Sequence, residues 1–215
     1  MFAITVEQMR EADRHTIEKG TPSAELMRRA AQGVFDTYPG WAGVKTLVVC
    51  GAGNNGGDGY ALASIMKDHD LDVTILRVSE KFSEDGNYYY DQCVKKGVPV
   101  LVFNTDPVKF EEYPVIVDCM LGTGFQGAPR EPIATVIAEI NYAREKAGAY
   151  VIAVDINSGM NGDTGEAENA VVSDLTVSIG YYKTGFFTGK APDIIGSLVN
   201  IDIGIELPES MVSEE

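Results

Sequence analysis

Three glycine-rich segments carry most of the side chains in this sequence that could do chemistry. They read GAGNNGGDG (51–59), VDCMLGTGFQGAPREP (117–132) and VDINSGMNGDTG (154–165), and each contains or follows the end of a short apolar run. In an open α/β sheet, ligands bind beyond the carboxyl ends of the strands. If the apolar runs are neighbouring strands, the three segments converge on one crevice.

The first segment predicts a site for an anionic or polar ligand. Residues 51–56 satisfy the pattern G-x-G-x-x-G, which permits a tight turn and offers backbone N–H groups to phosphate at the start of a helix. Asn54, Asn55 and Asp58 crowd this turn with side-chain oxygens. They predict either cation coordination or direct contact with the ligand. The alternative is a turn that Asx hydrogen bonds stabilise.

The other two segments each begin with a carboxylate where an apolar run ends. Asp118 precedes a loop with glycines at 122, 124 and 127, and Asp155 precedes the irregular turn that contains Ser158. Such a carboxylate could act as a general acid or base. The alternative for both is an aspartate that only caps local N–H groups.

The elements that must position these segments alternate between strands and helices. This alternation predicts an α/β fold: a three-layer α/β/α Rossmann-like domain with a mostly parallel sheet and N-terminal helices. We expect helices in the first 40 residues, after Gly59, and over 83–96 and 131–147, and strands over 46–50, 72–78, 99–103, 115–120 and 149–156. Residues 171–205 are expected to form edge strands.

The length favours one domain that spans residues 1–215. We expect N-terminal helices over 1–40, a Rossmann-like core over 45–205 and a frayed tail over 206–215. No apolar run is long enough for a membrane span, and the N-terminus lacks the pattern of a secretory signal. These features predict a cytoplasmic protein that does not bind membranes.

The charge and the scarcity of histidine exclude several classes of protein. The chain has 17 Lys and Arg residues against 32 Asp and Glu residues, a formal net charge of −15, and no block of basic residues. Nucleic-acid binding is therefore not expected. Two histidines leave little basis for a zinc site or a histidine-based triad, and three cysteines predict free thiols in a reducing compartment.

The three glycine-rich segments resemble those of a known family. VVCGAGNNGGDGYALA, VDCMLGTGFQGAPREP and VIAVDINSGMNGDTG are similar to hallmark segments of the NAD(P)H-hydrate epimerase family, the YjeF N-terminal domain. The stretch SIGYYKTGFFTGKAPDIIGSLVNIDIGI, with Lys183 and Gly185, resembles its closing segment. The resemblance implies an isomerase that interconverts the R and S forms of hydrated NADH and NADPH. This nucleotide repair step removes and re-adds water at carbon six of the nicotinamide ring.

The resemblance also implies a role for each matching residue. Potassium would be held by Asn55, Asp118 and Ser158. The substrate would be contacted by Asn54, Asn55, Gly56, Gly57, Asp58, Gly122, Thr123, Gly124, Phe125, Gln126, Gly127, Ala128 and Asp155. Our hypothesis is that Asp155 is the main catalytic acid and base, with Lys183 a weaker candidate for an anion or proton contact.

The family further implies a homodimer, formed by the N-terminal helices, and a dehydratase as a separate partner enzyme. Two positions depart from its pattern: Asn157 stands where proline is usual, and Arg28 replaces a glutamate. Two other functions stay open. One is a non-catalytic ligand-binding scaffold on the same fold, and the other is an NAD-dependent dehydrogenase that uses Glu80 to bind the ribose. The preference for NADH or NADPH hydrate is open too.

Overall fold

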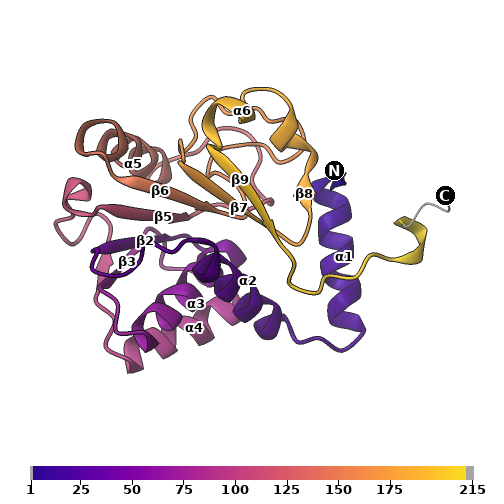
Figure 1. Cartoon of the computed structure of the whole chain (residues 1–215), viewed down its shortest axis with the longest axis horizontal. Coiled ribbons are helices and arrows are strands. Elements are labelled where there is room, and N and C mark those ends of the chain that lie inside the picture. The colour runs from indigo at the N-terminus through magenta and orange to yellow at the C-terminus, as the bar shows by residue number, and fades with distance from the viewer. Residues whose placement is uncertain (1, 212–215) are drawn as a thin grey trace.

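The computed structural model describes residues 2–211, and its central element is a sheet of seven strands that all run parallel (Figure 1). Successive strands in the sheet lie in the order β4-β3-β2-β5-β6-β7-β9. Their bounds are β2 Thr46–Cys50, β3 Val73–Arg77, β4 Val100–Val102, β5 Val115–Cys119, β6 Tyr150–Val154, β7 Leu175–Ile179 and β9 Ser197–Ile201. This confirms the predicted Rossmann-like class, and the sheet is parallel throughout.

Helices cover both faces of the sheet, as the three-layer prediction required (Figure 1). One face carries α2 (Ser23–Thr37), α3 (Asn54–Asp68) and α4 (Glu84–Lys95), and the other carries α5 (Ile133–Ala147) and the short α6 (Ala191–Ile194). Three 3₁₀ turns, Phe110–Glu112, Thr184–Phe187 and Glu209–Met211, complete the regular structure of the described residues.

The first helix, α1 (Val6–Glu18), stands at one end of the molecule beside β8 (Tyr182–Lys183). It begins at the capping box predicted from the sequence: the Thr5 side chain accepts from the Gln8 N–H, and the Gln8 side chain accepts from the Thr5 N–H. The preceding β1 (Ala3–Ile4) pairs with β8 in a second, two-stranded sheet. This pairing places α1 next to the ends of the main strands.

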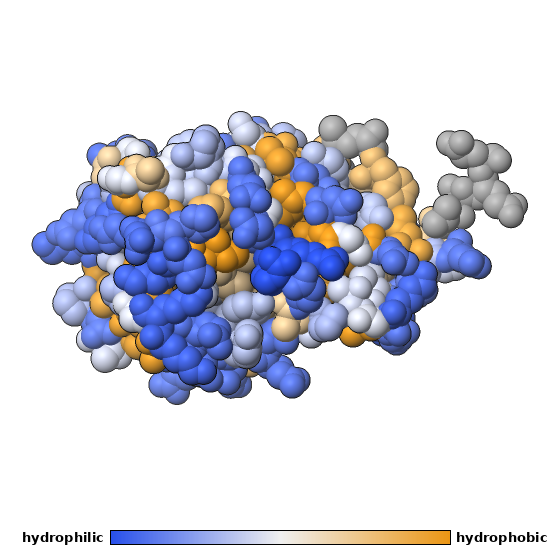
Figure 2. Space-filling view, turned by 60° about the horizontal axis from the view of Figure 1, so that its bottom comes forward, coloured by the Kyte–Doolittle hydropathy of each residue, from blue (hydrophilic) through white to orange (hydrophobic). Residues whose placement is uncertain are grey.

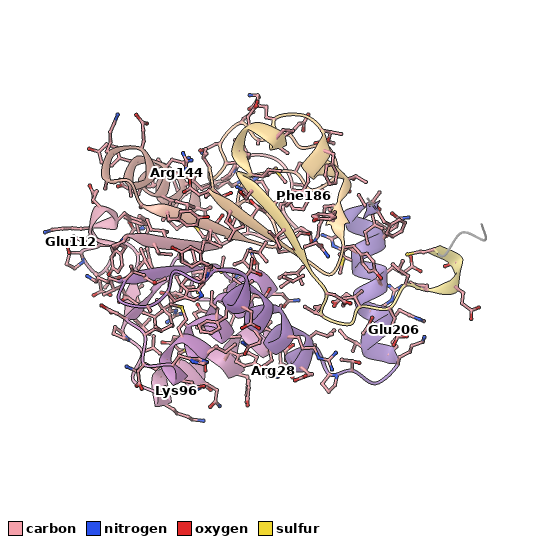
Figure 3. All side chains as sticks on the ribbon, in the orientation of Figure 1. Arg28, Lys96, Glu112, Arg144, Phe186 and Glu206 are labelled. Carbon is pink, nitrogen blue, oxygen red and sulfur yellow. The ribbon has the colours of Figure 1, made fainter. Side chains whose placement is uncertain are left out.

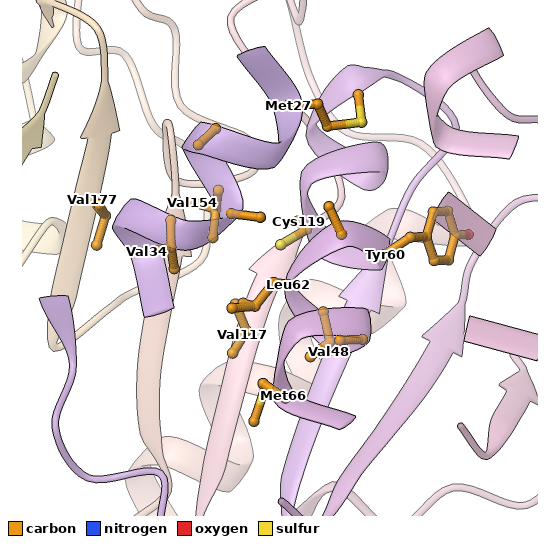
Figure 4. Close-up of a cluster of buried hydrophobic side chains, with 14 of the residues drawn as sticks. Met27, Val34, Val48, Tyr60, Leu62, Met66, Val117, Cys119, Val154 and Val177 are labelled. Carbon is orange, nitrogen blue, oxygen red and sulfur yellow. The ribbon is translucent and has the colours of Figure 1, made fainter. Parts of the chain in front are cut away.

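The hydrophobic core lies on both faces of the sheet because the central strands are buried on both sides. On one face Val48, Val117 and Val154 pack beneath α2 and α3 (Figure 4). On the other, Leu47 and Ile116 pack in a second cluster with residues of α5. Helix α3 runs very close to the strands: a Cβ at Gly59 would lie 2.7 Å from the sulfur of Cys50. Glycine thus permits the approach that holds the start of α3 at the sheet edge.

One part of the strand prediction was wrong. Residues 171–205 contain three strands, and only β9 lies at an edge of the main sheet. Strand β7 is paired on both sides, to β6 and β9, and β8 pairs with β1 in the small second sheet. All five residues of β7 are buried. Of the predicted tail, residues 206–211 contain only a 3₁₀ turn, and residues 212–215 lie outside the described part of the chain.

The surface agrees with the acidic, polar composition. The face that carries α2–α4 is mostly hydrophilic, with smaller apolar areas between the polar side chains (Figure 2). Arg28, one of the departures from the family pattern, lies on this outer side of α2 and pairs with Glu25 at 2.7 Å (Figure 3). Within residues 2–211, no helix is both long enough and apolar enough to cross a membrane.

Candidate active site

The strand order reverses between β2 and β5, and a large cavity opens there. From β2 the chain moves outward through β3 and β4, and then returns to place β5 on the other side of β2. Loops that leave these two strands in opposite directions create a crevice at their carboxyl ends. The cavity here has a volume of about 850 Å³, which is in the range of small-molecule sites.

The loop after β2 brings the open start of α3 to this cavity. Gly53 is the N-cap residue, and no side chain caps the helix. Its first N–H groups are therefore not capped by a side chain, as an anion site at a helix start requires, and the predicted anion binding stays a prediction. Asn54 and Asn55 line the cavity. Gly51 permits the turn, since a Cβ there would lie 1.9 Å from the Met120 carbonyl oxygen.

Asp118, Ser158, Leu121 and Asn55 form one buried hydrogen-bonded chain. Asp118 accepts from the Ser158 hydroxyl at 2.6 Å and from its N–H at 2.8 Å. The Ser158 oxygen accepts from the Leu121 N–H at 2.9 Å, and the Leu121 carbonyl accepts from the Asn55 amide at 2.8 Å. The remaining oxygen of Asn55, Oδ1, is buried and has no partner among the described residues.

Asp118 supplies the carboxyl group of this chain of hydrogen bonds, and the pKa of this group is shifted. Burial raises its pKa from 3.8 to about 6, against the hydrogen bonds from Ser158 and Met120, which lower it. None of the Lys or Arg residues that the structure describes forms an ion pair with it. A buried carboxylate without an ion pair and a buried amide oxygen without a partner, joined by one chain of hydrogen bonds, are features that favour a cation.

Asn157 holds the neighbouring turn in place, although the family has proline at this position. Its amide donates to the Val171 carbonyl and the Ser173 hydroxyl, both at 2.9 Å, and its oxygen accepts from Thr176 at 2.8 Å. The side chain is fully buried. These bonds provide the rigidity that a proline would provide through its ring, so the turn that contains Ser158 stays ordered.

Asp155 lies at the cavity in an ion pair with a buried lysine. The residue follows β6 with a φ of +65°, a left-handed conformation that costs energy for a side chain other than glycine and is frequent at functional sites. Lys183 is 0% exposed and donates to Asp155 Oδ1 and, at 2.9 Å, to the Ile179 carbonyl. Asp155 itself is 17% exposed and lines the cavity.

Two further carboxylates face the same space. Burial raises the pKa of Asp58 well above its usual range, the charges of Asp155 and Asp13 raise it further, and Lys183 opposes them. Burial and then Asp155 also raise the pKa of Asp13. Both side chains line the cavity. Two acidic groups and one lysine thus act on Asp58, and together with burial this favours its protonated form.

The structure brings most of the predicted site residues together around this cavity. Those that line it are Asn54, Asn55, Asp58, Gly122, Thr123, Gly124, Phe125, Gln126 and Asp155. Asp118 and Ser158 lie beneath it, fully buried. Gly56 and Gly57 are buried behind the loop, against the Gly51 backbone and Met27, and do not line the cavity. Gly127 and Ala128 line a second cavity of about 430 Å³.

The contribution of α1 to the site was not predicted from the sequence. Met9, Arg10 and Asp13 line the main cavity, although α1 precedes the Rossmann-like core. A signal was present: Asp13 falls on the same helical period as the apolar residues Val6 and Met9, where a carboxylate has no packing role. Burial in a polar crevice explains its position on that face.

The dehydrogenase alternative and cysteine chemistry both find little support at this site. Glu80 does not line the main cavity. At the end of β3, Arg77 instead lies over the rings of Phe82 and Tyr90, at 4.6 and 4.9 Å. Cys50, Cys93 and Cys119 are free and buried, and burial raises the pKa of each thiol. Buried protonated thiols are poor nucleophiles.

The fold and the crevice define a doubly wound α/β protein with a polar cavity at the switch point of its sheet. A family model described as "YjeF-related protein N-terminus" matches residues 23–185. The chain belongs to this family. The crystal structure of yeast ynu0 (YNL200c) has a TM-score of 0.77 and 22% identity, and the match covers 93% of this chain and 87% of that one. It supports the fold.

Two curated relatives differ in length. NAD(P)H-hydrate epimerase from Limosilactobacillus fermentum is 38% identical over 208 residues, which cover 93% of this chain and 96% of that protein. The bifunctional NAD(P)H-hydrate repair enzyme Nnr from Coxiella burnetii is 36% identical over 203 residues. That match covers 92% of this chain but only 40% of the relative. The chain thus corresponds to less than half of the bifunctional relative.

Proposed function

We propose that this protein is an isomerase that epimerises hydrated NADH and NADPH. Family membership and the near full-length match to an enzyme named NAD(P)H-hydrate epimerase support this function. The observation that carries it is the arrangement of the cavity. Asp155 and Asp58 lie where the crevice also presents the open start of α3.

The proposed chemistry needs what this cavity contains. The hydrate carries a hydroxyl on the carbon next to the ring nitrogen, so that its loss, assisted by the nitrogen, leaves a planar iminium. Water can then return to either face. Asp155 would exchange protons with the hydroxyl or the water and stabilise the cationic ring, while the first N–H groups of α3 would bind the diphosphate. The apolar wall of Met9, Leu26 and Met27 would contact the ring.

Among the predicted substrate contacts, the cavity supports those of Asn54 and of the loop 122–126. Contacts of Gly56 and Gly57 with the substrate stay a prediction. Gly127 and Ala128 would contribute only if the substrate extended beyond the main cavity, since they line the second one.

We also propose a potassium ion at Asn55, Asp118 and Ser158. The residues fit such an ion, because Asn55 Oδ1 is buried without a partner and the Asp118 carboxyl is buried without an ion pair within the described residues. Oxygen ligands of this kind suit hard cations. A bound ion would offset the charge of Asp118 and stabilise the loops that line the cavity.

The remaining predictions concern partners and location. Phe2 and Ile17 are 56% and 37% exposed at the α1 end of the molecule, which supports the proposed homodimer through the N-terminal helices. Light scattering would measure the mass in solution. A separate dehydratase partner and a cytoplasmic location stay predictions. The buried free thiols are compatible with a reducing compartment.

The function can be tested with purified hydrated NADH. We expect a sample enriched in the R form to reach an R/S mixture faster with the protein than without it, as followed by chromatography. Asp155→Asn should lose this acceleration. Oxidation of NADH by a panel of carbonyl substrates, with no effect on the hydrate epimers, would favour a dehydrogenase. Binding of hydrate without epimerisation would favour the scaffold.

A further inference from the structure

Four aspartates line the main cavity: Asp13, Asp58, Asp85 and Asp155. Three of them, Asp13, Asp58 and Asp155, come from distant parts of the chain and act on one another through their charges. Asp13 comes from α1, Asp58 from the second turn of α3, and Asp155 from the turn after β6. Lys183 from β8 pairs with Asp155. Among residues 2–211, no group of three or more His, Cys, Asp and Glu side chains is suited to hold a metal ion. The three carboxylates therefore call for another explanation.

Asp58 and Asp155 differ in the hydrogen-bond donors and charges that surround their carboxyl groups. Asp155 receives a hydrogen bond and a positive charge from Lys183 and a further hydrogen bond, at 3.4 Å, from the Ile179 N–H. Asp58 has no hydrogen-bond donor or ion-pair partner within the described residues. Two carboxylates in one site, one held by hydrogen-bond donors and the other without them, are suited to different roles in proton transfer.

The charged groups that face Asp58 are Asp155 from the end of β6, Asp13 from α1 and Lys183 from β8. Arg10, also from α1, lines the same cavity, and the buried thiol of Cys119 lies on the strand side. The two carboxylates and the burial outweigh the single lysine that acts on Asp58. Asp58 therefore keeps its proton to a higher pH than an exposed aspartate does.

We propose that Asp58 is the proton donor to the leaving hydroxyl, that Asp155 accepts the proton of the incoming water, and that Asp13 is a positioning residue that keeps the proton on Asp58. This inference rests on the proposed epimerase function. It divides between two residues the work that the sequence analysis assigned to Asp155, and it adds a residue from outside the part of the chain that the family model matches.

In this reaction the carbon–oxygen bond of the hydrate breaks, its electron pair and the Asp58 proton leave with the oxygen as water, and the nitrogen lone pair forms the iminium. A second water adds to the opposite face and gives its proton to Asp155. The pair is then protonated correctly for the reverse direction, and exchange with solvent water in the cavity restores the starting state.

The test is the pH profile of kcat/KM for epimerisation, from pH 5 to 9, in the wild type and four variants. Asp58→Asn should lower kcat about 100-fold or more, and Asp58→Glu should recover part of it. Asp13→Asn should move the alkaline limb to lower pH by at least about half a unit, because Asp58 then loses its proton more easily. Glu7→Gln removes a charge from α1 away from the cavity and should leave the limb in place.

A second measurement needs no activity. The ¹³C signal of the Asp58 carboxyl should titrate above the usual aspartate range in the wild type, and at lower pH in Asp13→Asn. An unchanged alkaline limb and titration in Asp13→Asn, or near wild-type activity in Asp58→Asn, would overturn the inference while the epimerase function stood. A wild type that does not interconvert the epimers would overturn both.

Discussion

The ion pair between Lys183 and Asp155 predicts a large loss of stability when only one partner is removed. Lys183 is 0% and Asp155 17% exposed, so the remaining charge would lack both a partner and full hydration. Removal of one partner from a buried pair costs about 3–5 kcal/mol. Because Asp155 still reaches the cavity, we expect about 3 kcal/mol for Lys183→Met and for Asp155→Asn.

Removal of both charges should cost less than the two single changes together. In Asp155→Asn/Lys183→Met no unpaired charge remains, so the double-mutant cycle should give a coupling energy of about 2 kcal/mol or more. Each single variant should still fold, since domains have about 5–15 kcal/mol of stability. The expected loss of epimerisation in Asp155→Asn therefore comes with a measurable loss of stability.

Urea unfolding, followed by circular dichroism and by the fluorescence of the single tryptophan, Trp41, measures these free energies. The matched control is the surface pair of Lys19 and Glu206, whose charged atoms lie 2.8 Å apart on side chains that are 54% and 57% exposed. Its cycle should give less than about 1 kcal/mol. A coupling no larger for Lys183 and Asp155 than for this control would refute the reasoning.

Three further predictions concern the loops of the site. Gly51→Ala should destabilise the protein by about 2 kcal/mol or more, because its Cβ would lie 1.9 Å from a backbone oxygen. Gly53→Ala, whose Cβ would have nothing within 4 Å, should cost less than about 1 kcal/mol. The urea midpoints of the two variants would distinguish these costs, and equal costs would contradict the close approach of Gly51 to Met120. Asn157→Ala should cost about 3 kcal/mol, since it leaves several buried polar groups without partners; a loss below about 1 kcal/mol in the same assay would show that these hydrogen bonds do not stabilise the turn. Asp118, with a pKa raised to about 6, binds its proton more tightly in the folded than in the unfolded chain. Without potassium, its contribution to the free energy of unfolding should therefore fall as pH rises from about 4 to about 6. Asp118→Asn should lose this part of the pH dependence, and an unchanged pH dependence in that variant would contradict the assignment.

Much of the fold could be predicted from the sequence because local patterns determine it. Continuous apolar runs such as 46–50 and 115–119 indicate strands buried on both faces, and the capping box at Thr5 marks the start of α1. The place of β7 inside the sheet could not be predicted in this way. Whether a buried strand has one neighbour or two depends on β9, which follows it along the chain.

The site was predictable where its residues follow strand ends, and not where they depend on distant packing. Asn55 and Asp155 stand beside glycines at the ends of apolar runs, so their convergence follows from the parallel sheet. The ion-pair partner of Asp155 could not be predicted in this way, because Lys183 lies on β8, 28 residues further along the sequence. Asp13 enters the site only because β1 pairs with β8 and places α1 there.

The central claim is that this cavity epimerises hydrated NADH by loss and return of water at one carbon. The direct measurement is mass spectrometry of both epimers during reaction in H₂¹⁸O, starting from the pure S form. We predict that the R product carries ¹⁸O on carbon six from the first turnovers and that the label appears at the rate of inversion. Inversion without the label, or no inversion above the rate without protein, would contradict the account.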